Sequence, residues 1–115
     1  MAAPQELILN GDVVQSAAAD NAIATASKAA TANARHFVSG IAADYSVAVA
    51  LIKTVTLKLG GVAKLIYRWD FSKGPFLHNF PVPIHGDYNA AVSVELEASG
   101  TGGTTGRVAF WVSSS

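Results

Sequence analysis

Apolar and polar residues alternate along much of this chain, and this alternation limits the fold more than any other feature. It is clearest in residues 91–98, where every second residue is apolar and the residues between are polar. The apolar set is Val92, Val94 and Leu96, and the polar set is Ser93, Glu95 and Glu97. A period of two places successive side chains on opposite faces of a β-strand. The pattern therefore predicts strands that bury one face.

A second alternating stretch, residues 47–59, leads into a hairpin signal. Its apolar residues share one parity and are predicted to point inward; they are Val47, Val49, Leu51, Val55, Leu57 and Leu59. Lys53 interrupts this set and indicates a bend. Gly60-Gly61 follows and precedes the β-rich run 63–71, which is typical of two antiparallel strands joined by a tight turn.

Residues 76–84 are predicted to form an edge strand. One parity is apolar or aromatic and comprises Phe76, His78, Phe80, Val82 and Ile84. Pro81 and Pro83 fall on the other parity, and proline cannot donate a hydrogen bond to a neighbouring strand. Two prolines in one strand therefore favour a place at the edge of a sheet, or a strand that is only partly paired.

Two further stretches complete the β pattern. Residues 36–46 carry Phe37 and Tyr45 as aromatic anchors, and Gly40 indicates a bulge. A glycine-rich loop at 99–106, predicted to be a mobile connector, leads to a last strand at 107–112. That strand places Val108, Phe110 and Val112 on one face. Six to eight short strands separated by turn signals predict an all-β fold, a small antiparallel β-sandwich or jelly roll.

The first third of the chain is less regular. Leu7, Ile8 and Leu9 precede the turn cluster at residues 10–12, which fits either a short strand with a turn or an extended arm. Alanine supplies more than half of residues 16–34, but no large apolar residue recurs at helical spacing, so strand and loop are favoured there. We expect one domain, with residues 1–34 as an N-terminal arm or additional strands and 35–115 as the β-sandwich.

The composition indicates a protein that covers much of its surface with other protein. Hydrophobic residues make up 50% of the chain and charged residues 14%, whereas about 25% of residues are charged in an average soluble domain. We therefore expect a homo-oligomer, a dimer or a trimer. The formal net charge is zero, which gives no electrostatic reason to bind nucleic acid or an anionic membrane. No membrane-spanning segment and no secretory signal are expected.

No residue pattern predicts catalysis, a metal site or a cofactor. The chain has no cysteine, so thiol chemistry and zinc–thiolate sites are excluded. His36, His78 and His85 lack metal-ligand spacing; His78 is expected on a sheet face and His85 in a turn. Glu95 and Glu97 share a strand face, which fits a solvated face or an intersubunit ion pair better than a catalytic carboxylate pair. The chain is not expected to be an enzyme.

From His36 to Val112 the sequence resembles a family of small phage structural proteins that decorate or cement the capsid. The resembling pieces are HFVSGIAADYS, KTVTLKLGGVAKLIYRWDF, FPVPI, HGDYNAAVSVELEASG and GTTGRVAFWV. The resemblance implies a β-sandwich or jelly-roll domain on the capsid exterior, made in the host cytoplasm. It also implies the major capsid protein as the partner, and no catalytic residue or cofactor.

Two functions are therefore expected, in order of preference. The first is a non-enzymatic virion protein that binds the capsid through protein contacts; the candidate interface residues are Leu7, Ile8, Leu9, Trp69 and Trp111. The alternative is a β-sandwich that binds carbohydrate or a receptor at the tip of a virion fibre. Exposed aromatic residues on one face would favour the alternative, and the candidates are Tyr45, Tyr67, Trp69, Tyr88 and Trp111.

Overall fold

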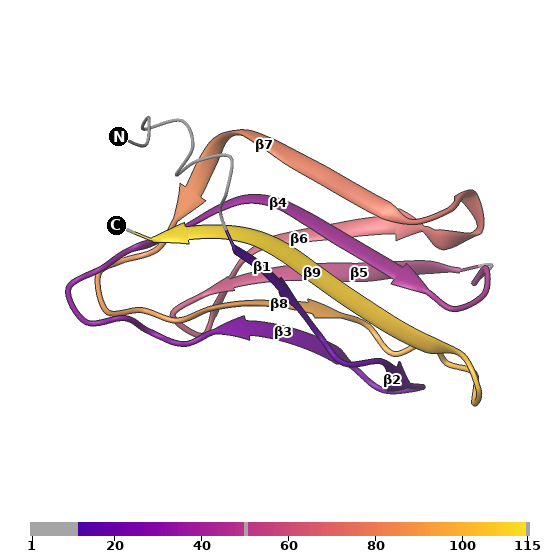
Figure 1. Ribbon diagram of the computed structural model, residues 1–115. Helices are drawn as coiled ribbons and strands as arrows, with labels where there is room; N and C mark the ends of the chain where they lie inside the picture. The colour runs from indigo at the N-terminus through magenta and orange to yellow at the C-terminus, as the bar shows by residue number, and fades with distance from the viewer. Residues whose placement is uncertain (1–11, 50, 115) are drawn as a thin grey trace.

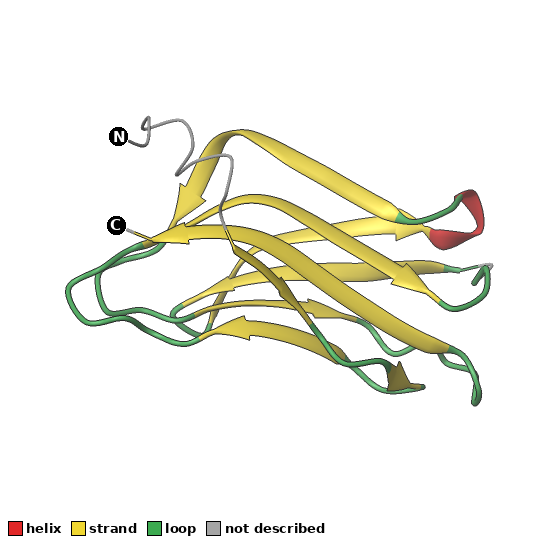
Figure 2. Cartoon of the chain, viewed as in Figure 1, coloured by secondary structure: helices red, strands yellow, loops and turns green. Residues whose placement is uncertain are grey.

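Two antiparallel β-sheets pack face to face in the computed structural model, which describes residues 12–49 and 51–114 (Figures 1 and 2). Sheet A contains, in order, β1 (Asp12–Gln15), β9 (Thr105–Ser114), β4 (His36–Tyr45) and β7 (Phe76–His85), and β2 (Ala19–Asp20) also pairs with β9. Sheet B contains, in order, β3 (Ala24–Lys28), β8 (Val92–Leu96), β5 (Ile52–Leu59) and β6 (Val62–Asp70). One 3₁₀ turn, η1 (Phe71–Lys73), joins β6 to β7. The predicted antiparallel β-sandwich is confirmed.

The alanine-rich stretch forms strands in both sheets, as its lack of helical periodicity predicted. β1 and β2 pair with β9 in sheet A, whereas β3 pairs with β8 in sheet B. In β3 the small residues Ala24 and Ala26 are buried, and Thr25 and Ser27 on the other parity are exposed. None of the described residues forms a helix long enough to cross a membrane. Leu7, Ile8 and Leu9 lie outside the described residues.

The core lies between the two sheets and is filled by the alternating apolar residues. Its members include Val55 and Leu57 of β5, and the inward sets of β8 and β9. Those two sets are Val92, Val94 and Leu96, and Val108, Phe110 and Val112, all of them buried as predicted.

A bulge in β4 reverses which residues point inward. The register against both neighbouring strands shifts between Val38 and Gly40, as Gly40 indicated. Before the shift His36 and Val38 are buried, and beyond Gly40, which is itself buried, the buried residues have odd numbers; these are Ile41, Ala43 and Tyr45. One extra residue in a strand moves every later side chain to the other face. Phe37 therefore lies half-buried on the outside of sheet A, whereas Tyr45 is a core residue.

The predicted hairpin joins β5 to β6 through Gly60 and Gly61, whose φ angles are 62° and 82°. Glycine is favoured at both positions because left-handed backbone strains other residues. The inward parity predicted for residues 47–51 is wrong at Val47 and Leu51, which are each 59% exposed. They precede β5, which begins at Ile52, so the alternation of the strand does not extend to them. Val49 is buried as predicted.

β7 is the edge strand of sheet A, as its prolines predicted. Phe76 is buried and His78, Phe80 and Ile84 are half-buried, but Val82 is 77% exposed, so the predicted alternation, which placed Val82 on the same side as these residues, fails there. The reason lies in the pairing with β4. Ile84 pairs with Val38 and Asn79 pairs with Gly40, so the four residues between Asn79 and Ile84 stand against a single residue of β4. The segment with both prolines leaves the regular ladder and turns Val82 outward.

Candidate functional site

The outer face of sheet B is mainly polar, although Ile52 and Ile66 are also exposed there. Strand register places Thr25, Glu95 and Thr56 side by side across β3, β8 and β5. The Lys58 ammonium lies 3.1 Å from the Glu95 carboxylate, so this face pairs its own charges. Glu95 is therefore a partner within the chain, neither a free carboxylate nor one half of a catalytic pair.

The outer face of sheet A is apolar over its central rows. Register places the following pairs next to one another across β1, β9, β4 and β7: Val13 with Trp111, Trp111 with Gly40, Ala109 with Ala42, and Ala42 with Leu77. We call Val13, Ala42, Leu77, Ala109 and Trp111 the sheet A face. Val13 and Leu77 are exposed, and the other three are half-exposed. An apolar surface of this kind marks a site of contact with another molecule.

Trp111 lies across the middle of the sheet A face. A Cβ atom on Gly40, its neighbour in β4, would come within 3.2 Å of the indole ring and within 2.8 Å of the Asn79 side-chain oxygen. The indole thus occupies the space above Gly40, and a side chain there would displace it. Trp111 is the predicted interface residue whose surroundings best fit that role.

A groove lies at one end of sheet A, beside the segment of β7 that leaves the ladder. Its volume is about 600 Å³, and it is lined by Phe37, Ser39, Pro81, Val82, Pro83, His85, Val112 and Ser113. We call it the β7 groove. The His85 ring packs against Phe37 at 5.4 Å between ring centroids. Most of the lining is apolar, so the groove suits an apolar protein segment better than a polar small molecule.

Trp69 lies elsewhere, in a row of aromatic rings that closes the side of the sandwich between β6 and β7. Tyr67 packs against Phe76 and His78 with centroids 5.5 and 5.1 Å apart, and His78 packs against Phe80 at 4.9 Å. The Trp69 indole N–H donates a 2.9 Å hydrogen bond to the Gly74 carbonyl. These rings bury much of their surface against one another, which leaves less surface available to a ligand.

Tyr88 is the candidate aromatic residue that is clearly exposed, at 56%. The Arg35 guanidinium lies 4.3 Å from the centre of its ring. The surrounding loops are joined to each other: the Asn89 side-chain oxygen accepts from the Asn33 N–H at 2.7 Å, and the Asn89 N–H donates to the Ala34 carbonyl at 3.1 Å. The loop holds Tyr88 in a defined position at one end of the sandwich.

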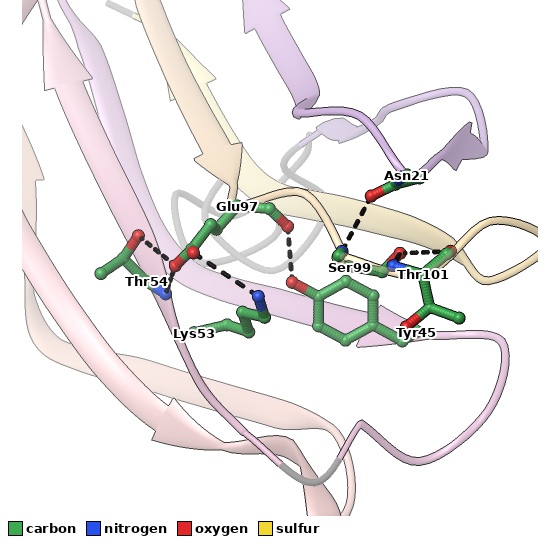
Figure 3. Close-up of polar contacts among 8 residues, drawn as sticks. Asn21, Tyr45, Lys53, Thr54, Glu97, Ser99 and Thr101 are labelled. Atoms are coloured by element: carbon green, nitrogen blue, oxygen red, sulfur yellow. Dashed lines mark hydrogen bonds and ion pairs between the residues drawn. The ribbon is translucent and has the colours of Figure 1, made fainter.

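Tyr45, also a candidate for ligand binding, is buried at the opposite end and belongs to a polar cluster (Figure 3). Its hydroxyl donates to the Glu97 carbonyl at 2.5 Å. The Glu97 carboxylate accepts from the Thr54 N–H at 3.0 Å and lies 3.6 Å from the ammonium of Lys53, which is buried within β5 and marks no bend. Burial, followed by the Glu97 charge, raises the pKa of Tyr45 to about 12.

The same cluster explains the state of Glu97. The backbone N–H of Thr54 and, to a smaller extent, the Lys53 charge hold the pKa of the Glu97 carboxyl below its ordinary value. A carboxylate held in its charged form by three partners is a structural group. It has neither the raised pKa nor the free oxygen atoms that a general acid needs.

The glycine-rich loop after β8 is also tied to its neighbours. The Ser99 hydroxyl donates to the Thr104 carbonyl across the loop at 3.0 Å, and both residues are buried. The Gly100 and Gly103 N–H groups donate to the side chains of Asn21 and Asp20, at 2.9 and 2.8 Å (Figure 3 shows the Asn21 contact). The loop thus has more internal contacts than the connector that its composition predicted.

The three histidines have different surroundings. His36 is buried; its Nε2 donates to the Ala29 carbonyl at 2.8 Å, and its Nδ1 lies 2.6 Å from the Ser114 hydroxyl. His78 belongs to the aromatic row and His85 to the β7 groove. No group of three metal-binding side chains occurs among residues 12–49 and 51–114.

Sequence reasoning missed the two features that make sheet A distinctive. The exposed Val82 and the β7 groove arise from the irregular pairing of β7 with β4. The two prolines predicted a strand at an edge or only partly paired, but neither the outward position of Val82 nor the groove followed from them. The sheet A face was missed because its members come from four strands far apart in the sequence.

The fold and its surfaces define a two-sheet β-sandwich with one apolar outer face. No protein-family model matches the chain, and no curated protein sequence matches it. Among solved structures it is similar to the CBM36-1 domain of a multidomain xylanase from the hindgut metagenome of Trinervitermes trinervoides, with 14% identity and a TM-score of 0.48. The match covers 88% of this chain and 96% of that one. A likeness at this level carries no inference about what this chain binds.

Proposed function

We propose that this protein is a non-enzymatic structural component of a virion, which decorates or cements the capsid of a phage through contacts with the major capsid protein. Its place would be the capsid exterior, after synthesis in the host cytoplasm. The observation that carries the proposal is the apolar outer side of sheet A, with the β7 groove at one end. Val82, 77% exposed beside the groove, offers an apolar side chain that the fold itself does not use.

The β7 groove is the surface that we assign to the shell. The prolines remove backbone donors from the outer edge of β7, so a partner is bound there by side-chain contacts rather than by an added β-strand. Apolar grooves in stable assemblies are filled by apolar or aromatic anchors of the partner. The resemblance of residues 36–112 to capsid decoration proteins supports this assignment, because such proteins work by contacts of this kind.

The test is co-sedimentation with shells assembled from the major capsid protein of the phage that carries the gene. Wild-type protein should pellet with the shells, and Val82→Asp should remain in the supernatant because its carboxylate would be desolvated in the contact. Ile66→Asp is the matched control, since Ile66 is an exposed β-branched residue on the outside of sheet B. Wild-type protein that stays in the supernatant at all concentrations contradicts the function.

The second candidate function is a carbohydrate- or receptor-binding module, and one observation favours it. Tyr88 presents an exposed ring, and Asp87, which precedes it in the chain, lines a cleft of about 330 Å³ together with Lys64 and His85. An aromatic platform beside hydrogen-bonding groups is a suitable arrangement for a sugar ring. Retention of wild-type protein on immobilised glycans, with loss of retention for Tyr88→Ala, would support this function over capsid decoration.

A further inference from the structure

We propose that the sheet A face binds the same face of a second copy of this chain, about a two-fold axis that runs along the strands between β4 and β9. The inference names the partner that covers the sheet A face. It rests on the proposed function in one respect, which is that the β7 groove stays free to bind the shell.

The axis follows from the residue pairs of β4 and β9. Register places Asp44 opposite Arg107, Ala42 opposite Ala109, and Gly40 opposite Trp111. The axis is parallel to the strands and lies midway between β4 and β9. Rotation by 180° about it places each β9 residue of one copy over the β4 residue of the same row in the other copy. Asp44 then faces the partner's Arg107, and Arg107 faces the partner's Asp44. A two-fold interface requires this reciprocity.

Charge complementarity supports this arrangement. Asp44 and Arg107 are both exposed at one end of the otherwise apolar face. Neither belongs to an ion pair within 4.0 Å among residues 12–49 and 51–114. In the dimer each carboxylate lies between two guanidinium groups, its own chain's and the partner's. Such a ring of alternating charges fixes register and orientation more than it adds affinity.

The middle of the sheet A face suits close approach of two sheets. Ala42 and Ala109 are adjacent and small, so they form a flat floor beside Trp111. Leu77 flanks this floor, is 63% exposed and lies over the partner's Gln15 in the dimer, because Gln15 of β1 pairs with Ala109 in the same row. Sheets that pack face to face are about 10 Å apart, a separation that side chains of this size fill.

The outer area of sheet A is of the same order as the area that a specific protein interface buries on each partner. The ten-residue strands β9, β4 and β7, about 4.8 Å apart and with about 3.3 Å per residue, cover roughly 14 by 33 Å, and the four residues of β1 add about 60 Å². The total is on the order of 500 Å² in projection, and the accessible surface of a face with side chains exceeds its projection. A specific interface buries about 800 Å² on each partner.

Other described surfaces suit a second copy less well. The sheet B face carries the Lys58–Glu95 pair and several hydroxyls. β6 is a free edge, but antiparallel pairing of two copies about Ile66 would set Lys64 opposite the partner's Arg68, which are like charges. β7 is protected from pairing by its prolines.

The first experiment measures association of the full chain by sedimentation equilibrium, without shells. Wild-type protein should be a dimer at micromolar concentration. Leu77→Asp should weaken the dimer by about a hundredfold or more, because it desolvates a carboxylate beside the alanine floor, with only the partner's Gln15 amide in the same row to offset this. Ile66→Asp should dimerise like wild type, since Ile66 has the same 63% exposure on the opposite sheet.

The second experiment separates contacts across the interface from contacts within one chain. Asp44→Arg alone and Arg107→Asp alone should each weaken the dimer by about tenfold, because each sets like charges against each other. A mixture of the two variants should recover a heterodimer of wild-type strength. Each variant keeps its like charges within its own chain, so recovery can only come from pairing between chains.

The possible outcomes separate this inference from the proposed function. A wild-type monomer or trimer, unchanged dimerisation of Leu77→Asp, or a mixture that stays weakly associated overturns the dimer. If the charge variants behave as stated, they support it even where Leu77→Asp does not fold. Shell binding without dimerisation leaves the proposed function standing and removes the inference, and dimerisation without shell binding does the reverse.

Discussion

The two outer faces of the sandwich cover the same core but differ in what they can do. Sheet B presents mainly threonines, serines and a paired lysine and glutamate. Water and neighbouring side chains provide the hydrogen bonds and charge partners of these groups. Sheet A presents alanines, an indole and exposed aliphatic side chains, and its charges stand at one end. An antiparallel sheet is stable with one face wet. The fold therefore does not require the outer side of sheet A to be apolar.

The difference also shows how irregular strands create binding surfaces. β5 and β8 of sheet B pair without interruption, and their outer residues stay in a plain alternation, although β5 and β6 shift register between Leu57 and Lys58. β4 and β7 of sheet A shift register around Gly40, which leaves the segment with Pro81 and Pro83 outside the ladder. Bulges commonly occur where a sheet meets a ligand or a partner. Here the bulge produces the β7 groove.

The largest effect is expected for the residues that both sheets share, their common core. Leu57→Ala should lower the free energy of unfolding by about 2–5 kcal/mol, because it leaves a cavity at a fully buried position. Thr56→Ala, the neighbouring outward residue, should change it far less. Chemical denaturation of both variants checks this. If Thr56→Ala proved the more harmful, the inward and outward faces of sheet B would have to be exchanged.

A smaller effect is expected at the bulge that distinguishes sheet A. Gly40→Ala should cost about 1–3 kcal/mol of stability, because the new Cβ would overlap the Asn79 side chain and press on the Trp111 ring. Trp111 fluorescence should shift in the folded state, since the indole has to move. Gly102→Ala is the control, as nothing lies within 4 Å of the Cβ position there. Equal stability of the two variants would contradict the close contact above Gly40.

The Lys58–Glu95 ion pair on sheet B should contribute less to the free energy of unfolding than Leu57 or Gly40. A double-mutant cycle on Lys58 and Glu95 should give a coupling of about 0.2–1 kcal/mol, because both side chains are partly exposed and screened by water. The coupling should fall as salt is added. A coupling of several kcal/mol, insensitive to salt, would mean that the sheet B face is covered by protein and would remove the contrast between the two faces.

The last comparison depends on pH. At neutral pH Glu97→Gln keeps the oxygen that accepts from the Thr54 N–H but removes the charge beside the buried Lys53 ammonium, so it should lower stability. A second difference appears in acid. The Glu97 carboxyl has a pKa below its unfolded value, so its contribution to stability is present above that value and is lost as pH falls through the folded pKa. The wild type should therefore lose more stability than Glu97→Gln below about pH 4.3. Parallel losses in thermal melts across this range would contradict the cluster in Figure 3.

Most of the sandwich could be predicted from local pattern. Strand existence, the hairpin at Gly60-Gly61, the edge position of β7 and the inward sets of β8 and β9 all follow from the period of two and from glycine and proline. Errors came where the period was extended too far, at Val47 and Leu51 before β5, and at Val82 within β7. In both places the backbone leaves the strand, and alternation has no meaning outside a strand.

The candidate site was predictable only in part. Trp111 was named from its size and character, and it lies at the centre of the sheet A face. Tyr45 was named for the same reason and is buried against Glu97, while Trp69 lies in the row of rings between β6 and β7. Residue type indicates that an aromatic side chain will bury surface, but not whether it buries it inside the chain or against a partner.

The sequence by itself determined that this chain is all β, that it is poor in charge, and which parity of most strands faces the core. These properties depend on neighbours along the chain, because side-chain direction in a strand is set by position. Tertiary structure alone decided that Val13, Ala42, Leu77 and Trp111 form one surface and that Asp44 lies opposite Arg107. Such contacts join β1, β4, β7 and β9, whose register is fixed by the bulge at Gly40 and by packing across the sandwich rather than by local sequence.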